Sequence, residues 1–255
     1  MATGERRELI TRPPCAARRA AALALLVASA TAQAAPFVVD DFLAPGNGDW
    51  KPRSFAGDTE YRPVEIDGRR ALCARAKASA SALIREVDVD LDRTPYLRWT
   101  WKARILPQGS AAETSKAGDD YAARIYVVRE GLLGRLTAHA LNYVWSRRQP
   151  VDTRWPNAFT GRAILQAVDA GAPRGWVTHT RNVRADWDAA FGDRADTIDA
   201  VAIMTDADNT ASEAAACYAD IRFCATATCG ETEDAPQSTG RSSAASDTTT
   251  PSSSQ

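Results

Sequence analysis

Three oxygen-bearing side chains near the C-terminal end of the sequence could bind a hard cation. Asp206, Asp208 and Asn209 directly follow an apolar run at residues 198–204, which places them in a loop at the end of a strand. Carboxylate and amide oxygens are calcium ligands, so calcium is the cofactor that this segment suggests. The segment lacks the glycine and the distant glutamate of the known calcium-binding loop. Capping of the loop by the same side chains is therefore the alternative interpretation.

Charged and aromatic side chains in two strand-like segments could bind a sugar. They are Arg98, Lys102, Asp120, Arg124 and Tyr126. Each alternates with apolar residues, and residues two apart share a face of a strand. If the two strands are neighbours, the charged groups offer hydrogen bonds to sugar hydroxyls, and the tyrosine ring offers a stacking platform. Cross-strand pairs of opposite charge on a solvated sheet produce the same pattern and are the competing interpretation.

Tryptophans occur both in the strand-like segments and between them. Trp99 and Trp101 share a face with aliphatic residues, which predicts that they pack in a core. Trp155 and Trp187 fall in loop-like segments. A tryptophan in such a place either contacts a ligand at the rim of a sandwich or closes the end of a core. Both roles remain open for these two residues, which are therefore ligand-binding candidates.

Paired carboxylates would allow glycoside chemistry, which needs two such groups on either side of the scissile bond. Asp120 with Asp206 or Asp208 is the candidate pair, because Asp119 and Asp120 are adjacent and would point to opposite faces of a strand. The sequence has no G-x-S-x-G, no H-E-x-x-H and no phosphate-binding glycine motif. No catalytic residue is therefore assigned.

Short runs of period-two alternation dominate the middle of the sequence and predict strands. The predicted strands are residues 61–66, 70–76, 83–91, 97–105, 121–127, 138–146, 163–169, 176–183, 198–205 and 217–223. Residues 185–190 and 209–215 are each predicted to form a short helical turn, and residues 170–175 to form a hairpin. Many short strands with few helices predict an all-β fold, namely a two-sheet β-sandwich of the jelly-roll type.

The two ends of the 255-residue chain differ in composition from its middle. Residues 1–34 carry five arginines, then an apolar run, then the pattern Ala32-Gln33-Ala34, which is the order of a secretory signal peptide. The apolar run is shorter than the roughly 20 residues that cross a bilayer, so we expect cleavage and no membrane span in the mature chain. Residues 231–255 lack large apolar side chains and are predicted to be a disordered Ser/Thr-rich tail. One domain at residues 35–230 remains, with a periplasmic or secreted location.

Charge and cysteines narrow the function classes further. After removal of residues 1–34, 26 basic and 30 acidic residues remain, scattered singly, which does not indicate nucleic-acid binding. Four cysteines also remain, and an even number in an oxidising compartment predicts disulfides. Cys224 and Cys229 bracket a short loop and are the expected first pair, which leaves Cys73 with Cys217. Zinc binding is the alternative, but it needs closer cysteine pairs and nearby histidines.

Several segments together resemble a bacterial family known as domain of unknown function 3047. They are LRWTWK at 97–102, GDDYAARIYV at 118–127, MTDADNT at 204–210 and YADIRF at 218–223. The resemblance covers residues 37–223 and implies a fold and an export habit, because the family has no established activity. DDF at 40–42 and YADIRF also resemble the end strands of galactose-binding-like jelly rolls, the architecture of many carbohydrate-binding modules.

The leading hypothesis is an exported, non-enzymatic envelope protein that binds a carbohydrate or a cell-wall glycan. Export, the jelly-roll-like end strands and the lack of catalytic motifs motivate it. The first alternative is a carbohydrate-active enzyme, of glycoside hydrolase or lyase type, that uses paired carboxylates. The second alternative is a structural envelope protein without a small ligand.

Overall fold

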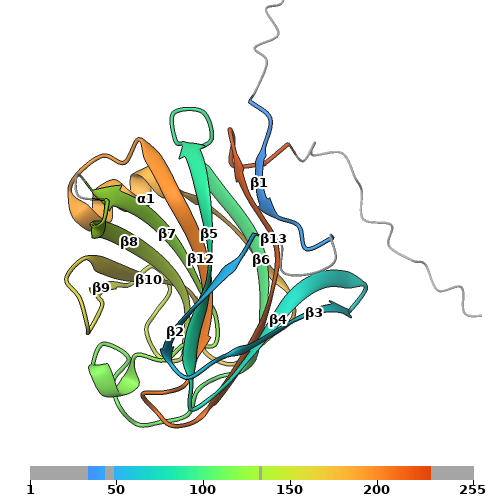
Figure 1. The fold of residues 1–255 in the computed structure, drawn as a ribbon, viewed down its shortest axis with the longest axis vertical. Coiled ribbons are helices and arrows are strands. Elements are labelled where there is room, and N and C mark those ends of the chain that lie inside the picture. Colours follow the sequence, from blue (N-terminus) through green and yellow to red (C-terminus); the bar gives the residue numbers. More distant parts are fainter. Residues whose placement is uncertain (1–33, 44–48, 132–133, 231–255) are drawn as a thin grey trace, which may run out of the picture. The chain divides into compact units, whose positions relative to one another are not determined.

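Two β-sheets pack face to face and enclose a large apolar core (Figure 1). The computed structural model describes residues 34–43, 49–131 and 134–230. The predicted signal peptide up to residue 33 and the predicted tail at 231–255 lie outside the described residues. The predicted fold class, an all-β sandwich of two sheets, is confirmed.

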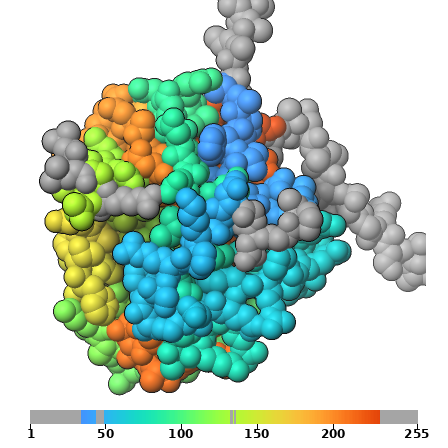
Figure 2. All heavy atoms as spheres, viewed as in Figure 1, coloured from blue at the N-terminus to red at the C-terminus, as the bar shows by residue number. Residues whose placement is uncertain are grey.

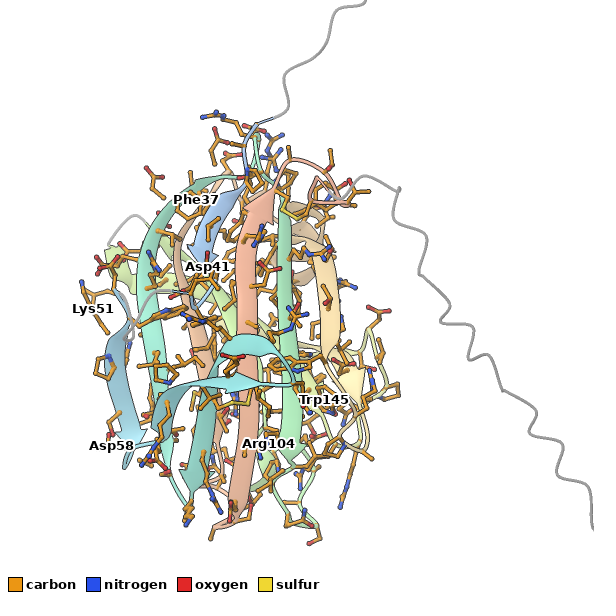
Figure 3. The ribbon with its side chains drawn as sticks, turned by 90° about the vertical axis from the view of Figure 1, so that its right-hand side faces the viewer. Phe37, Asp41, Lys51, Asp58, Arg104 and Trp145 are labelled. Carbon is orange, nitrogen blue, oxygen red and sulfur yellow. A yellow bond between two sulfur atoms is a disulfide. The ribbon has the colours of Figure 1, made fainter. Side chains whose placement is uncertain are left out.

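In the part of the chain that the structure describes, sheet A has six strands, all paired antiparallel. Its order is β11 (Val177–Asn182), β6 (Tyr96–Ile105), β13 (Glu213–Cys224), β4 (Arg69–Lys77) and β3 (Glu60–Ile66), with β1 (Phe37–Asp40) also paired to β13. Figure 3 looks onto this sheet, in which β13 runs between β4 and β6. The first and last strands of the sandwich therefore lie side by side.

Sheet B has seven strands within the same described ranges. Its order is β2 (Lys51–Ala56), β5 (Ala80–Asp90), β12 (Thr197–Asp206), β7 (Arg124–Gly131), β8 (Gly134–Ser146), β10 (Ala163–Ala170) and β9 (Arg154–Pro156). Its pairs are antiparallel except that β8 and β10 run parallel. Figure 2 shows the strands β1 to β4, coloured blue to cyan, over much of the face turned to the viewer; of these only β2 belongs to sheet B.

The core forms because alternate residues of each strand are apolar and point to the same side of the sheet. Trp99 and Trp101 of β6 are fully buried, as predicted. The ring of Trp99 stacks on that of Tyr143 from β8, with the ring centroids 5.2 Å apart, so an aromatic contact joins sheet A to sheet B. The polar residues between these positions are left to the outer faces of the sandwich.

One α-helix lies among the described residues, α1 (Val183–Phe191), together with the short 3-10 turn η1 (Lys116–Gly118). The side chain of Asn182 accepts the Ala185 N–H at 3.1 Å and caps the helix start. Gly192 ends the helix with a φ of 72°, a backbone conformation that favours glycine. The predicted turn at 185–190 is thus part of α1. No helix in the described ranges combines the length and apolar character that a membrane crossing requires.

Two local predictions are wrong. Residues 209–215 are not helical but form a turn followed by the start of β13, because the N–H groups of Asn209 and Thr210 bind the carboxylate of Asp120. Residues 170–175 do not form a hairpin, since β10 and β11 belong to different sheets. The prediction of a turn from the composition of this segment was correct. The turn, however, joins a strand of sheet B to a strand of sheet A.

Two disulfides connect the predicted cysteine pairs. Cys73 of β4 and Cys217 of β13 face each other in register and are bonded. Cys224, at the end of β13, is bonded to Cys229. The first bridge spans a sequence separation of 144 residues and the second a separation of 5, so they constrain the unfolded chain very differently.

Replacement of both Cys73 and Cys217 by alanine should lower the free energy of unfolding by about 4–5 kcal/mol, from the loop entropy released in the unfolded chain. The matched double replacement of Cys224 and Cys229 should cost only about 2 kcal/mol, because it opens a short loop. Urea unfolding of the three proteins measures both differences. Equal losses for the two variants would contradict the loop-entropy explanation.

Candidate functional site

A cleft of about 450 Å³ opens on the outer face of sheet B. Arg124 and Tyr126 of β7 line it, because the residues that alternate with them, Ile125 and Val127, point into the core. The same face contributes Asn142, Met204 and Asp206, and the adjoining strand β2 contributes Phe55. Loop residues complete the lining, notably Asp119, Asn157, Phe159 and Asp208.

A buried ion pair forms the polar centre of the cleft. Arg124 Nε donates to Asp206 Oδ1 at 3.0 Å, and Arg124 Nη2 donates to Asp206 Oδ2 at 2.5 Å. The two side chains are 4% and 2% exposed. Arg124 also donates to the carbonyl oxygen of Asp119 at 2.5 Å and to the Tyr126 hydroxyl at 3.3 Å. Asp206 Oδ1 in turn accepts the Tyr121 N–H at 3.1 Å, so the pair is held from both sides.

The loop that precedes β7 brings Asp119 and Asp120 to this centre. Gly118 is required there, because a Cβ atom at this position would collide with the carbonyl oxygen of Ala112. Asp119 Oδ2 accepts the Asn157 side-chain N–H at 2.9 Å, which joins the loop to the far wall of the cleft. The two adjacent carboxylates have different partners, but they lie in a loop and not in the strand that the sequence predicted.

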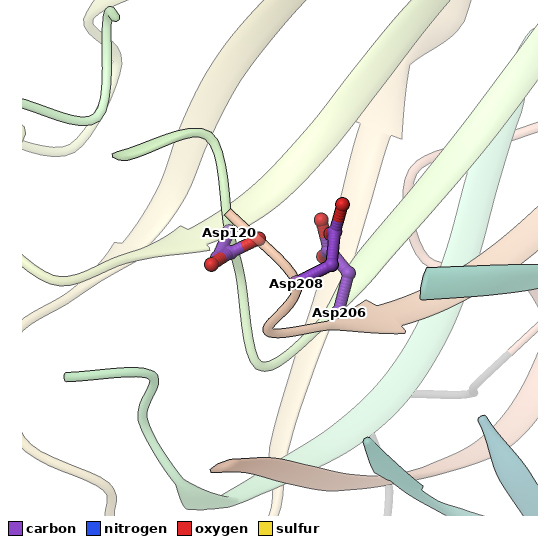
Figure 4. A group of neighbouring side chains, drawn as sticks. All are labelled: Asp120, Asp206 and Asp208. Carbon is purple, nitrogen blue, oxygen red and sulfur yellow. The ribbon is translucent and has the colours of Figure 1, made fainter. Parts of the chain in front are cut away.

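Asp120 is fully buried and caps the loop that follows β12. Its Oδ1 accepts the backbone and side-chain N–H groups of Asn209, each at 3.2 Å, and its Oδ2 accepts the Thr210 N–H at 2.6 Å. Asp120, Asp206 and Asp208 each offer one carboxylate oxygen such that the three atoms lie within 4.8 Å of one another (Figure 4). The sequence left open whether these residues converge with Arg124, and in the structure they do.

Burial, together with neighbouring charges, raises the pKa values of three carboxyl groups of the site. Burial raises the pKa of Asp206 to about 8, with further contributions from the charges of Asp120 and Asp119, and these outweigh the opposing effect of Arg124. Burial also raises the pKa of Asp119, against the charge of Arg124. For Asp208, burial and the neighbouring charge of Asp120 raise the pKa. The carboxyl groups of the site outnumber its basic side chains.

The structure brings some of the predicted site residues together in the cleft and places the others elsewhere. Arg124, Tyr126, Asp206, Asp208 and Asn209 line the cleft, and Asp120 lies directly beside it. Tyr126 is partly buried and its hydroxyl donates to Met204 Sδ at 3.2 Å, so its ring is part of the floor and not a free platform.

The placement of Arg98 and Lys102 with these residues was wrong. Both lie on β6, which belongs to sheet A, whereas Arg124 and Tyr126 lie on β7 of sheet B. The two sets therefore face outward on opposite sides of the sandwich. Lys102 Nζ is 2.7 Å from Asp67 Oδ2, and Arg98 lies 4.0 Å from Asp220, so pairing on a sheet surface, the competing interpretation, describes them.

Trp155 and Trp187 are not exposed rim residues. Trp155 lies on β9, is 6% exposed and packs near Tyr121, with the ring centroids 6.3 Å apart. Trp187 lies on α1, is 1% exposed and donates its indole N–H to Asp193 at 3.2 Å. Trp187 therefore closes the core, one of the two roles left open by the sequence, whereas Trp155 packs in a separate apolar cluster with Tyr121 and Leu165.

Sequence reasoning missed several lining residues. Asn142 carried a signal, because it is the one polar residue in the run at 140–145 of β8 and occupies an outward position. Phe55 and Phe159 carried none, since they lie in segments without alternation and their sequence neighbours are polar or small. Asp119 was considered but assigned to the opposite face.

The fold and the site together define a mostly antiparallel β-sandwich with a polar, ligand-sized cleft on the outer face of one sheet. Residues 48–222 match the family model described as "Protein of unknown function (DUF3047)", and the chain belongs to this family. The resemblance recognised in the sequence is thereby confirmed. Among curated proteins, none matches this sequence.

Solved structures with a similar fold include two carbohydrate-binding modules from Clostridium thermocellum and a cellulase. The family 11 module of Lic26A-Cel5E is 10% identical with a TM-score of 0.43, and 77% of this chain and 97% of the module are covered. The family 30 module of Cel9D-Cel44B is 11% identical with a TM-score of 0.40, covering 75% and 93%. An engineered Cel12A cellulase derived from Rhodothermus marinus is 11% identical with a TM-score of 0.38, covering 67% and 98%. These likenesses concern the fold and do not identify a ligand.

The raised pKa of Asp206 predicts a stability that falls as the pH rises. A carboxyl with a pKa of about 8 in the folded chain holds a proton that the unfolded chain releases near its usual pKa of 3.8, so its stabilising contribution is full in acid and is lost as the pH approaches 8. Between pH 5 and pH 9, the melting temperature of the wild type should fall by at least about 5 °C more than that of Asp206→Asn. Parallel profiles for the two proteins in thermal unfolding would contradict this.

Proposed function

We propose that this protein binds a carbohydrate in the cleft of sheet B and does so without catalysis. The observation that carries the proposal is that exposed aromatic rings and buried polar groups line one cleft. Phe55 and Phe159 are 58% and 56% exposed, whereas Arg124, Asn142 and Asp206 are at most 3% exposed. A sugar has apolar C–H faces and polar hydroxyl edges, so such a cleft offers partners to both.

The polar part of the cleft is organised before any ligand arrives. The bidentate contact between Arg124 and Asp206, and the hydrogen bond from Asn157 to Asp119, hold these side chains in one geometry. A ligand would therefore meet groups that need little ordering, which reduces the entropic cost of binding. The volume of about 450 Å³ is in the range of small-molecule sites.

We also propose that the chain is exported to the periplasm or beyond the cell. The two disulfides support this, because such bonds persist in oxidising compartments. Mass spectrometry of protein recovered from the producing cells should give a chain that begins at Ala35 with both disulfides closed. A chain that retains Met1 and has four free thiols at residues 73, 217, 224 and 229 would contradict export.

Replacement of Phe159 by alanine should weaken glycan binding roughly tenfold, because the variant loses an aromatic surface for the sugar ring. A glycan array identifies the ligand, and calorimetry then measures the affinity of the wild type and the variant. Val151→Ala, which removes an exposed apolar side chain outside the cleft, is the matched control and should bind as the wild type does.

The same experiment separates the competing functions. Failure of the wild type to bind any glycan would favour a structural envelope protein. Release of shorter products from a polysaccharide, lost in Asp206→Asn, would favour an enzyme that uses Asp206 with Asp120 or Asp208. The calcium prediction for Asp206, Asp208 and Asn209 is tested by thermal unfolding with millimolar calcium and with chelator. A rise that Asp208→Asn abolishes supports calcium binding, and no rise leaves loop capping as the role of these side chains.

A further inference from the structure

The cleft is lined by more acidic than basic side chains. Among the described residues that line it, Asp119, Asp206 and Asp208 are acidic and Arg124 alone is basic. Asp120 adds a fourth carboxylate directly beside them. Carboxylates this close repel one another unless a proton or a cation compensates them. A positively charged ligand group would therefore be favoured here.

Two buried oxygen atoms in the cleft have no hydrogen-bond partner. They are Oδ1 of Asp119 and Oδ1 of Asn142, in side chains that belong to residues only 3% and 1% exposed. The nearest charged contact of Asp119 Oδ1 is Arg124 Nη2 at 3.6 Å, which is too long for a hydrogen bond. The amide nitrogen of Asn142 donates to the Ile164 carbonyl at 3.2 Å, which leaves its oxygen without a donor. Buried polar atoms normally have a hydrogen-bond partner. A donor group of a ligand would therefore complete the hydrogen bonding of both oxygens.

Most donors of the Arg124 guanidinium are already used within the protein. Arg124 donates through Nε, Nη1 and Nη2 to Asp206, to the Tyr126 hydroxyl and to the Asp119 carbonyl. Little capacity remains to bind an acidic sugar through this guanidinium. Both unpaired oxygens and the excess of acidic side chains lie in the same cleft, where an ammonium group with three N–H donors supplies hydrogen bonds and positive charge.

We infer that the cleft selects glycans that carry a free amino group, that is, amino sugars without an N-acetyl substituent. This rests on the proposed carbohydrate-binding function and names its ligand class. The ammonium group lies against Asp119 Oδ1 and Asn142 Oδ1, while the sugar ring contacts the exposed phenylalanines. N-acetylation removes the charge and two of the three N–H donors that would meet these oxygens.

Three tetrasaccharides with the same β-1,4-linked glucose backbone test the inference, because they differ only at carbon 2. The substituent is an ammonium group, an N-acetyl group or a hydroxyl group. Calorimetry at a pH slightly below neutrality, with a chelator present, should give an affinity for the amino form roughly tenfold above that for the other two. Asp119→Asn should reduce this preference to about threefold or less, whereas Asp88→Asn, an exposed carboxylate outside the cleft, should leave it unchanged.

Each outcome bears on a separate claim. Equal affinities for the three sugars, each weakened by Phe159→Ala, would overturn the amino-sugar inference and leave carbohydrate binding standing. No binding of these sugars or of any glycan on an array would remove both. An equal loss in Asp119→Asn and Asp88→Asn would show attraction to overall charge and overturn the inference. If Asp119→Asn does not fold, as judged by its melting temperature, Asp208→Asn replaces it and should show the same loss of preference.

Discussion

The buried contact between Arg124 and Asp206 is the constraint on which the outer face of sheet B depends. A guanidinium taken out of water needs a carboxylate and hydrogen-bond acceptors around it, and removal of either partner leaves an uncompensated charge in a poorly solvated place. The pair links β7 to β12, where Arg124 and Met204 are in register, and also binds the backbone of Asp119 and Tyr121. The loop before β7 is therefore fixed against the sheet by electrostatics, and the walls of the cleft follow from that attachment.

Strands with one apolar and one polar face could be predicted from the sequence. The pairing of the strands could not. Residues 97–105 were predicted because tryptophan and leucine alternate with charged residues, and the structure places that strand as β6. The short strands β2 and β9 escaped prediction, since they lie at the two edges of sheet B and carry no alternation. The partner of a strand is set by contacts between distant segments, which a local pattern does not encode. The expected hairpin at 170–175 was wrong for that reason.

The candidate site was predictable where it lies on strands and unpredictable where it lies in loops. Arg124 and Asp206 were both identified from their position relative to apolar runs, although nothing local showed that they form a pair. Asp119, Asn157 and Phe159 reach the cleft through loop geometry that depends on tertiary contacts. Trp187 was expected in a loop, whereas it lies on the buried face of α1, the helix that contains the predicted helical turn at 185–190. Arg98 shares the charged character of Arg124 but lies on the other layer, a difference that composition cannot express.

The pairing of β1 with β13 has a practical consequence for how the domain can be handled. Phe37 lies opposite Phe223 in sheet A, so the two ends of the sandwich leave from neighbouring strands of one layer. The cleft faces away from that layer, on the outer side of sheet B. A fusion partner, an affinity tag or a surface linkage at either end is thus attached on the side opposite the cleft. The domain can be immobilised or displayed with its cleft open to long polymeric ligands.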